Sequence, residues 1–165
     1  QSFMICEPLE LEYLASVAKK RGHHVEVLDM IIEKKKLSSF LKKMPYDLVA
    51  ITAYLPHVNI VNSYAGEIKK FNSEITVIVG GIVAEVQGYV FNKQLIDYVV
   101  EQKPLQTFEE ILSHFDDKAC IAQLEGILKD QPNPVRSLEI PTVFPDREVT
   151  RKYRKHYNYV FHHLL

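Results

Sequence analysis

Two short apolar runs constrain the fold of this chain more than any other feature. They cover residues 47–54 and 75–81, and both are rich in Val and Ile. Continuous apolar runs of this length are typical of strands in a parallel sheet that is covered on both faces. The first run ends in a hydroxyl and an aromatic side chain, and the second ends in two glycines. Because open parallel sheets bind ligands at the carboxyl ends of their strands, we expect the functional site there.

Helical and strand-like patterns alternate as far as Val100. Helices are predicted at residues 8–21, 37–43, 57–71 and 107–112, and strands at residues 24–29, 47–54, 75–81 and 96–100, with residues 124–129 as a further candidate strand. The helix at 57–71 has an apolar stripe on one face, and Thr107 is expected to cap the helix at 107–112, with Glu110 completing a capping box. This alternation implies crossover connections and therefore a doubly wound parallel sheet in an α/β domain. Such a sheet normally begins with a strand, whereas Pro8 opens a helix. We expect a piece of a longer protein whose first strand lies upstream of Gln1, with a remnant at Ser2–Cys6 as the alternative.

The chain changes character after residue 129, where prolines at positions 132, 134, 141 and 145 break any regular pattern. We therefore divide it into an α/β domain at residues 1–129 and a linker with a final helix at residues 130–165. Asp146 is predicted to cap that helix. We expect its tyrosines, Tyr153 and Tyr157 among them, to contact a further domain downstream. Phosphate or nucleic-acid binding by its basic residues is the alternative.

The composition excludes several classes of protein. The 165 residues carry a formal net charge of −1, which gives no electrostatic argument for a nucleic-acid or membrane partner. No apolar stretch approaches the roughly 18 residues of a membrane helix. The two cysteines, Cys6 and Cys120, are too few for a disulfide framework or a zinc site and fit a cytoplasmic protein. No spacing of histidines predicts a metal site, and no pattern predicts a catalytic residue.

The residues at the ends of the two runs suggest a slot for a flat ligand. Gly80 and Gly81 let a planar group approach the backbone closely, and the hydroxyl of Thr52 can hydrogen-bond to a ring nitrogen. A turn that needs glycine, and a threonine chosen for its strand propensity, are the structural alternatives. A dinucleotide site is disfavoured because the G-x-G-x-x-G fingerprint is absent.

A collinear set of motifs strengthens this interpretation. They are Glu7-Pro8-Leu9-x-Leu11-x-Tyr13-Leu14-Ala15, Gly22-His23-x-Val25-x-Val27-x-Asp29, Asp47-Leu48-Val49-Ala50-Ile51-Thr52, Val79-Gly80-Gly81 and Ile96-Asp97-Tyr98-Val99-Val100. The set resembles the cobalamin (vitamin B12)-binding domain that precedes the catalytic barrel of many radical S-adenosylmethionine enzymes. The segment Phe144–Arg147 is similar to the connector into that barrel. The resemblance implies a flavodoxin-like (Rossmann-like) fold.

The resemblance also assigns the site residues. Thr52-Ala53-Tyr54 matches the Ser/Thr-x-Leu element that contacts the lower-axial base of cobalamin, with tyrosine in place of leucine. Gly80-Gly81, followed by Ile82, matches the double glycine over which the nucleotide tail lies. The loop from Tyr54 to His57 would flank the corrin ring. His57 is expected to be a polar residue at the start of a helix, and a role as an axial ligand or as a group next to the ligands is the alternative.

The chain departs from the pattern of the family at three places. The Asp-x-His-x-x-Gly motif of the mutase branch is absent, and Glu101–Gln106 replaces the usual glycine-rich loop after the Asp-Tyr-Val-Val strand. The cysteine motif for a 4Fe-4S cluster is missing, so the cluster and S-adenosylmethionine would belong to the parent enzyme and not to this chain.

The resemblance therefore implies a cobalamin-binding module without catalysis of its own, which positions a corrinoid for a downstream radical SAM domain of the same protein. A homodimer is a further expectation. The altered loop leaves an alternative open: a degenerate, non-binding scaffold for dimerisation or substrate docking.

Overall fold

The computed structural model describes residues 5–52, 54–129 and 139–157, and the chain falls into two compact units. Unit 2 is Lys35–Pro141 and contains the sheet, whereas unit 1 combines Gln1–Lys34 with Thr142–Leu165. The predicted domain boundary at residue 129 lies inside unit 2 and stays a prediction. The first strand expected upstream, and the remnant at residues 2–4, lie outside the described residues.

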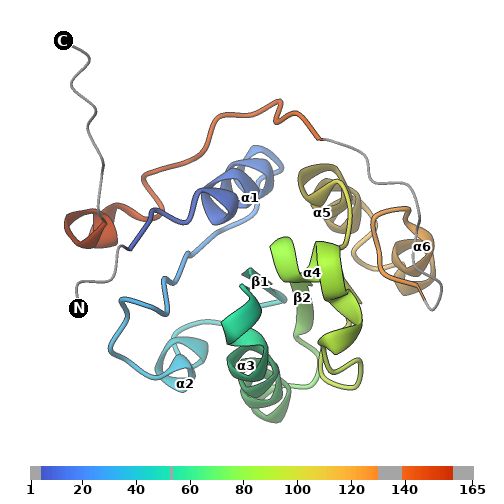
Figure 1. Cartoon of the computed structure of the whole chain (residues 1–165), viewed down its shortest axis with the longest axis horizontal. Helices are drawn as coiled ribbons and strands as arrows, with labels where there is room; N and C mark the ends of the chain where they lie inside the picture. Colours follow the sequence, from blue (N-terminus) through green and yellow to red (C-terminus); the bar gives the residue numbers. More distant parts are fainter. Residues whose placement is uncertain (1–4, 53, 130–138, 158–165) are drawn as a thin grey trace. The chain divides into compact units, whose positions relative to one another are not determined.

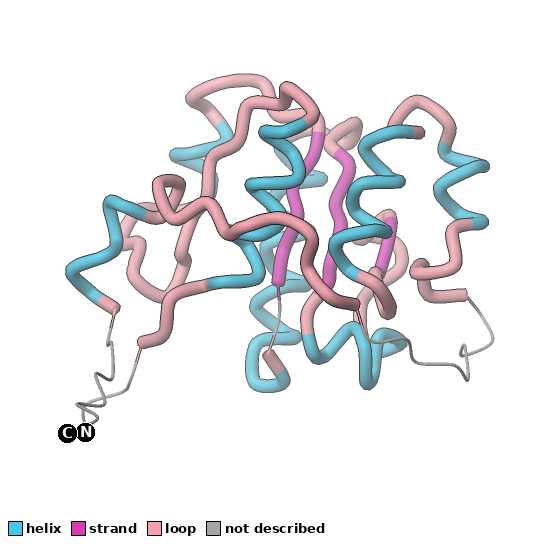
Figure 2. Tube along the Cα trace, turned by 90° about the horizontal axis from the view of Figure 1, so that it is seen from above, coloured by secondary structure: helices cyan, strands magenta, loops and turns pink. Residues whose placement is uncertain are grey.

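In its described part, unit 2 has a parallel sheet with the strand order β1-β2-β3. The strands are β1, Leu48–Thr52, β2, Thr76–Gly80, and β3, Tyr98–Val99. β1 and β2 pair along their whole length, from Leu48 opposite Thr76 to Thr52 opposite Gly80. Figure 2 shows the strands side by side. The two apolar runs of the sequence are therefore neighbouring parallel strands, and the predicted flavodoxin-like α/β class is confirmed.

The helices of unit 2 lie on both sides of this sheet. They are α2 (Leu37–Leu41), η1 (Leu55–His57), α3 (Val58–Phe71), α4 (Ile82–Gln87), η2 (Gly88–Val90), α5 (Pro104–Ser113) and α6 (Lys118–Gln123). Figure 1 shows α3 and α5 on opposite sides of the strands. This arrangement explains why β2 is apolar at every position from Val77 to Val79, which are at most 3% exposed.

The stripe predicted on the helix at residues 57–71 forms the core face of α3. Val61, Ala65 and Ile68 recur at helical spacing and are at most 3% exposed. On the other side of the sheet, Phe108 and Ile111 of α5 are also buried. Each face of the sheet is therefore covered by a helix with buried apolar residues.

An ion pair holds the strands together at their amino ends. The Nζ atom of Lys69 lies 2.6 Å from Oδ2 of Asp97 and donates to the carbonyl oxygen of Ile75 at 2.7 Å. Asp97 Oδ2 also accepts the backbone N–H of Val77 at 2.7 Å. This network is at the end of the sheet opposite to the predicted ligand edge.

Helix α5 begins earlier than the sequence pattern predicts. Thr107 was expected to cap it, but the helix starts at Pro104, and Thr107 is 1% exposed in its interior. The Thr107 hydroxyl donates to the carbonyl oxygen of Gln102 at 2.9 Å. Proline suits the first turn because its missing N–H would have no helical partner there. The capping box predicted with Glu110 is therefore wrong.

Unit 1 contains α1, Leu9–Lys20, and η3, Arg151–His156. Gly22 has φ +86° directly after α1, as expected for a glycine that ends a helix. The predicted strand at residues 24–29 is wrong: the inward positions Val27 and Asp29 are buried, but no described strand pairs with this segment. The alternation of apolar and polar residues at 24–29 therefore identified which side chains are buried, but it did not show whether the backbone pairs with another strand.

The terminal segments of unit 1 meet through polar contacts. The Glu12 carboxylate is fully buried and accepts a hydrogen bond from the Thr150 hydroxyl. Burial raises the pKa of Glu12, and the Thr150 hydrogen bond opposes that rise. Lys19 pairs with Asp146 at 2.7 Å.

Two tyrosines of the final segment are buried within the chain: Tyr153 and Tyr157 are 4% and 6% exposed inside unit 1. Contact of this segment with a downstream domain stays a prediction. The Tyr153 hydroxyl donates to Glu33 at 3.1 Å. Asp146 does not cap η3, which begins after Thr150.

Candidate functional site

The carboxyl ends of β1 and β2 meet at one point of the sheet. Thr52, the last residue of β1, pairs with Gly80, the last residue of β2. The sequence placed both at strand ends but gave no register. A shift of one residue would have turned Thr52 to the other face and away from this partner. The parallel ladder therefore brings the predicted hydroxyl and the predicted glycine floor together.

Gly80 and Gly81 differ in their backbone conformation and in whether the fold requires a glycine. Gly81 has φ +88° and ψ −178°, a backbone region that is almost restricted to glycine. It turns the chain directly from β2 into α4. Gly80 has ordinary strand geometry, and an added Cβ would lie 3.9 Å from Cβ of Val100, which is normal contact. Gly81 is thus required by the turn, whereas Gly80 leaves bare backbone that the fold itself does not need.

The segment after β1 carries two rings at the same edge. Tyr54 is 51% exposed and packs edge-on against His57, with ring centroids 6.2 Å apart and an angle of 87° between the planes. The His57 backbone N–H donates to the Tyr54 carbonyl oxygen at 2.8 Å, which closes the turn of η1. Ala53 lies outside the described residues. The turn therefore holds both rings next to the end of β1.

Helix α4 adds an exposed apolar row that the sequence reasoning missed. Ile82, Val86 and Tyr89 are 48%, 49% and 72% exposed and follow one another at helical spacing through α4 and η2. Only Ile82 was named in advance. The i, i+4, i+7 spacing was visible, but a sequence does not show whether such a row faces the core or the solvent.

The chain itself covers the carboxyl end of β3. The N–H groups of Glu101 and Gln102 both donate to the Gly126 carbonyl oxygen, and Leu128 N–H donates to Val99 O at 2.8 Å. A Cβ on Gly126 would come within 1.9 Å of the Thr107 hydroxyl, so glycine alone fits there. A strand had been predicted at residues 124–129, and a single antiparallel bridge, Val100 to Ile127, is what forms.

A carboxylate closes the N-terminus of α5. Glu139 accepts the N–H groups of Leu105 and Gln106 at 2.8 and 2.7 Å, one with each oxygen. These are charge-assisted bonds at the positive end of the helix dipole. Lys103 has φ 44° and pairs with Glu125 at 3.0 Å. The backbone N–H groups of Glu101, Gln102, Leu105 and Gln106 and the side chain of Lys103 are therefore bound within this chain.

The bare backbone at Gly80 fits a flat group that lies on the sheet, because a side chain there would fill the space such a group needs. Among the described residues, no three His, Cys, Asp or Glu side chains gather as a metal site would require. An open hollow lined by Leu112–Lys118 is at the C-terminal end of α5, away from the strand ends that carry Thr52 and Gly80. None of the described helices has the length and apolar character to cross a membrane.

Comparison with known proteins identifies the family of this chain. The family described as "B12 binding domain" matches residues 2–112, more than half of the chain. No curated protein and no solved structure matches the chain. The matched range contains β1, β2 and β3 and every predicted site residue. The chain belongs to the B12 binding domain family.

Proposed function

We propose that this chain binds a corrinoid cofactor, cobalamin, at the carboxyl edge of β1 and β2. The observation that carries the proposal is the pairing of Thr52 with Gly80, which sets a residue with a hydroxyl opposite a residue without a side chain at the ends of two strands. Thr52 would contact the base of the nucleotide tail, and Gly80 and Gly81 would let that tail lie against the sheet. Tyr54, His57 and Ile82 would flank the macrocycle. A bound corrinoid would supply methyl-carrying cobalt chemistry, and the protein would supply orientation.

We further propose that the parent protein is a radical SAM enzyme of the cytoplasm. The collinear motifs and the segment Phe144–Arg147 support this parentage. Its 4Fe-4S cluster and S-adenosylmethionine would be bound by a downstream domain of the same protein, with which this module shares the cofactor. The free cysteines, Cys6 and Cys120, are in keeping with a reducing compartment. A homodimer is compatible with this role.

One observation favours a second candidate, a non-binding scaffold. Residues 124–128 and Glu139 occupy the end of β3 and the N-terminus of α5. A corrinoid that needed to contact the end of β3 or the N-terminus of α5 could not bind, because residues of the chain occupy both places. The two candidates differ in a single measurable property, which is whether the chain retains a corrinoid.

The test is retention of hydroxocobalamin. The full chain is incubated with hydroxocobalamin and desalted, and its visible spectrum is recorded. The binding proposal predicts corrinoid absorbance in the protein fraction, and a colourless fraction would favour the scaffold.

Two variants locate the site. Gly80→Val should weaken retention about tenfold to a hundredfold, because overpacking costs about 1–3 kcal/mol. Gly66→Ala is the matched control: it adds a methyl group to α3, 3.6 Å from Leu95, and should bind as the wild type does. Equal binding by both variants would contradict the placement of the site at Gly80.

A further inference from the structure

Glu12 connects α1 to the last described segment of unit 1. Its fully buried carboxylate accepts the hydrogen bond from the Thr150 hydroxyl, and its backbone carbonyl oxygen accepts the N–H of Asp146 at 3.0 Å. The 142–157 segment is therefore bound to α1 through both the side chain and the backbone of Glu12.

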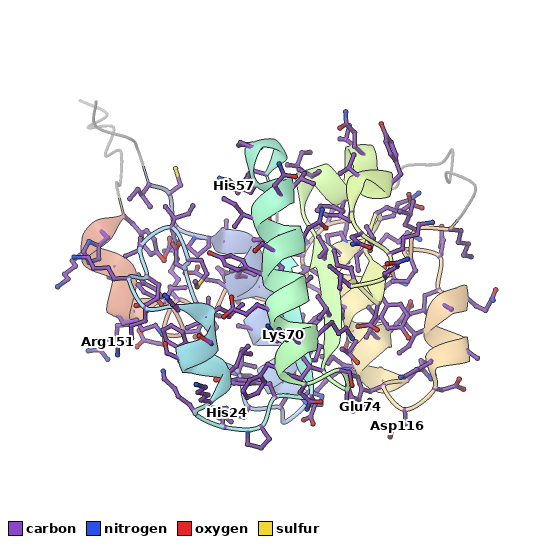
Figure 3. The ribbon with its side chains drawn as sticks, turned by 90° about the horizontal axis from the view of Figure 1, so that it is seen from below. His24, His57, Lys70, Glu74, Asp116 and Arg151 are labelled. Carbon is purple, nitrogen blue, oxygen red and sulfur yellow. The ribbon has the colours of Figure 1, made fainter. Side chains whose placement is uncertain are left out.

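The 142–157 segment presents hydroxyl groups to the interior of unit 1 and keeps its cations near the solvent. Thr150, Tyr153 and Tyr157 are buried. Arg151, in contrast, lies on the outside of η3 with a side chain that is 75% exposed (Figure 3). A hydroxyl can donate a hydrogen bond to a carboxylate, but it does not neutralise the charge of that carboxylate. The interior of this contact therefore favours a carboxyl group that keeps its proton.

One guanidinium serves two carboxylates beside this contact. The Nε atom of Arg147 lies 3.5 Å from Oε2 of Glu7 and 4.0 Å from Oε2 of Glu12, and the Arg147 side chain is 58% exposed. Oε2 of Glu12 is buried and accepts no hydrogen bond from the described part of the chain. An ionised Glu12 would be a buried charge with one hydroxyl donor and a distant, hydrated cation, which costs free energy. A protonated Glu12 carries no charge and can donate to the Glu7 carboxylate next to it.

The other groups around Glu12 are Glu7, Arg147, Tyr157 and, next to Tyr157, Asp29. Arg147 stays charged. Burial raises the pKa of Tyr157, and the Asp29 carboxylate raises it further, so this hydroxyl stays neutral where carboxyl groups titrate. Glu7 has a cation at 3.5 Å, and Asp29 accepts a backbone N–H at 3.0 Å. Glu12 is thus the carboxylate in this cluster whose second oxygen lacks a donor.

We propose that the 142–157 segment is a latch on α1 that a proton on Glu12 holds closed and that loss of this proton helps to release. Burial raises the pKa of Glu12 above 4.5, so the open form loses the proton at a lower pH than the closed form. Between pH 4.5 and the folded pKa of Glu12, the ratio of open to closed latch rises about tenfold per pH unit. The segment contains Phe144–Arg147, the proposed connector, so pH would change the freedom of that connector. This inference does not depend on corrinoid binding.

Amide hydrogen exchange, followed by nuclear magnetic resonance, measures the opening of the latch. The full chain is exchanged at several values between about pH 4 and pH 8, and each rate is corrected for the intrinsic pH dependence of exchange. The amide of Asp146 reports the contact directly, because it donates to the Glu12 carbonyl oxygen. We expect its protection factor to fall about tenfold per pH unit above pH 4.5 and then to level off, while amides within α5 keep theirs. A constant protection factor at Asp146, or an equal fall in α5, would overturn the inference.

Three variants assign the effect to one carboxyl group. Glu12→Gln keeps an oxygen for Thr150, places an N–H donor in the position of the proton and cannot ionise, so protection of Asp146 should no longer vary with pH. Glu10→Gln, at an exposed position of α1, is the matched control and should keep the pH dependence of the wild type. Asp29→Asn should keep it as well. A pH dependence that survives in Glu12→Gln, or that disappears in Asp29→Asn, would contradict the assignment to Glu12.

Discussion

Alanine at Gly80 and at Gly81 should have opposite effects on the free energy of unfolding. Replacing glycine by alanine at a compatible position stabilises a protein by about 0.4–1 kcal/mol, because the unfolded chain loses freedom. Gly80 is compatible, since its new methyl group would meet Val100 at a normal 3.9 Å. Gly81 is not, because φ +88° with ψ −178° costs a residue with a Cβ about 1–3 kcal/mol.

The difference between the two variants isolates the backbone strain. Both changes alter the unfolded chain in the same way, so that contribution cancels, and Gly81→Ala should be less stable than Gly80→Ala by about 1–3 kcal/mol. At about 2–4 °C per kcal/mol, the melting temperatures should differ by roughly 2–12 °C. Urea unfolding followed by circular dichroism measures the difference directly. Equal stability of the two variants would refute the reasoning that Gly81 alone is required by the turn.

Three further changes test the rest of the fold. Lys69→Met should lower the free energy of unfolding by about 1–3 kcal/mol, because it removes the cation bonded to Asp97; unchanged urea unfolding would contradict this. Glu139→Gln should cost about 1 kcal/mol and speed amide exchange in the first turn of α5; unaltered exchange would contradict the cap. The pKa of Glu12 is raised by burial, so its contribution is fully present below pH 4.5 and is lost as pH rises through the folded pKa. Glu12→Gln should flatten that decline in urea titrations above pH 4.5, and an unchanged slope would contradict it.

Local features of the sequence predicted the centre of unit 2. The apolar runs became β1 and β2, and Gly22 and Gly81 marked chain reversals where the structure has positive φ. These predictions succeeded because each depends on only a few neighbouring residues. A strand that is buried on both faces needs a continuous apolar run, and a turn with positive φ needs a glycine. The register that pairs Thr52 with Gly80 could not be predicted in this way, because a run that is apolar at every position keeps the same pattern after a shift of one residue.

Features that depend on distant residues could not be predicted. The start of α5 is set by Pro104 and by Glu139, whose carboxylate arrives from 33 residues beyond Gln106. The burial of Tyr153 depends on Glu33, 120 residues earlier. No local pattern encodes such partners, so the sequence placed Thr107 at a helix cap and did not show that Tyr153 is buried within the chain. Alternation at residues 24–29 failed for the same reason, since a strand needs a neighbour for its backbone.

The altered loop at Glu101–Gln106 has a structural role, because it connects β3 and α5 to the segment at residues 125–139. Its backbone is engaged by Gly126, its lysine by Glu125 and the helix that follows by Glu139. Gly126 fits because nothing larger than hydrogen has room beside Thr107. These contacts are made at the end of β3, whereas Thr52, Tyr54 and Gly80 are on β1, on the turn after β1 and on β2. Because residues of the chain itself occupy the end of β3, this part of the sheet edge is not open to a ligand. A bound corrinoid would therefore have to contact the ends of β1 and β2 alone.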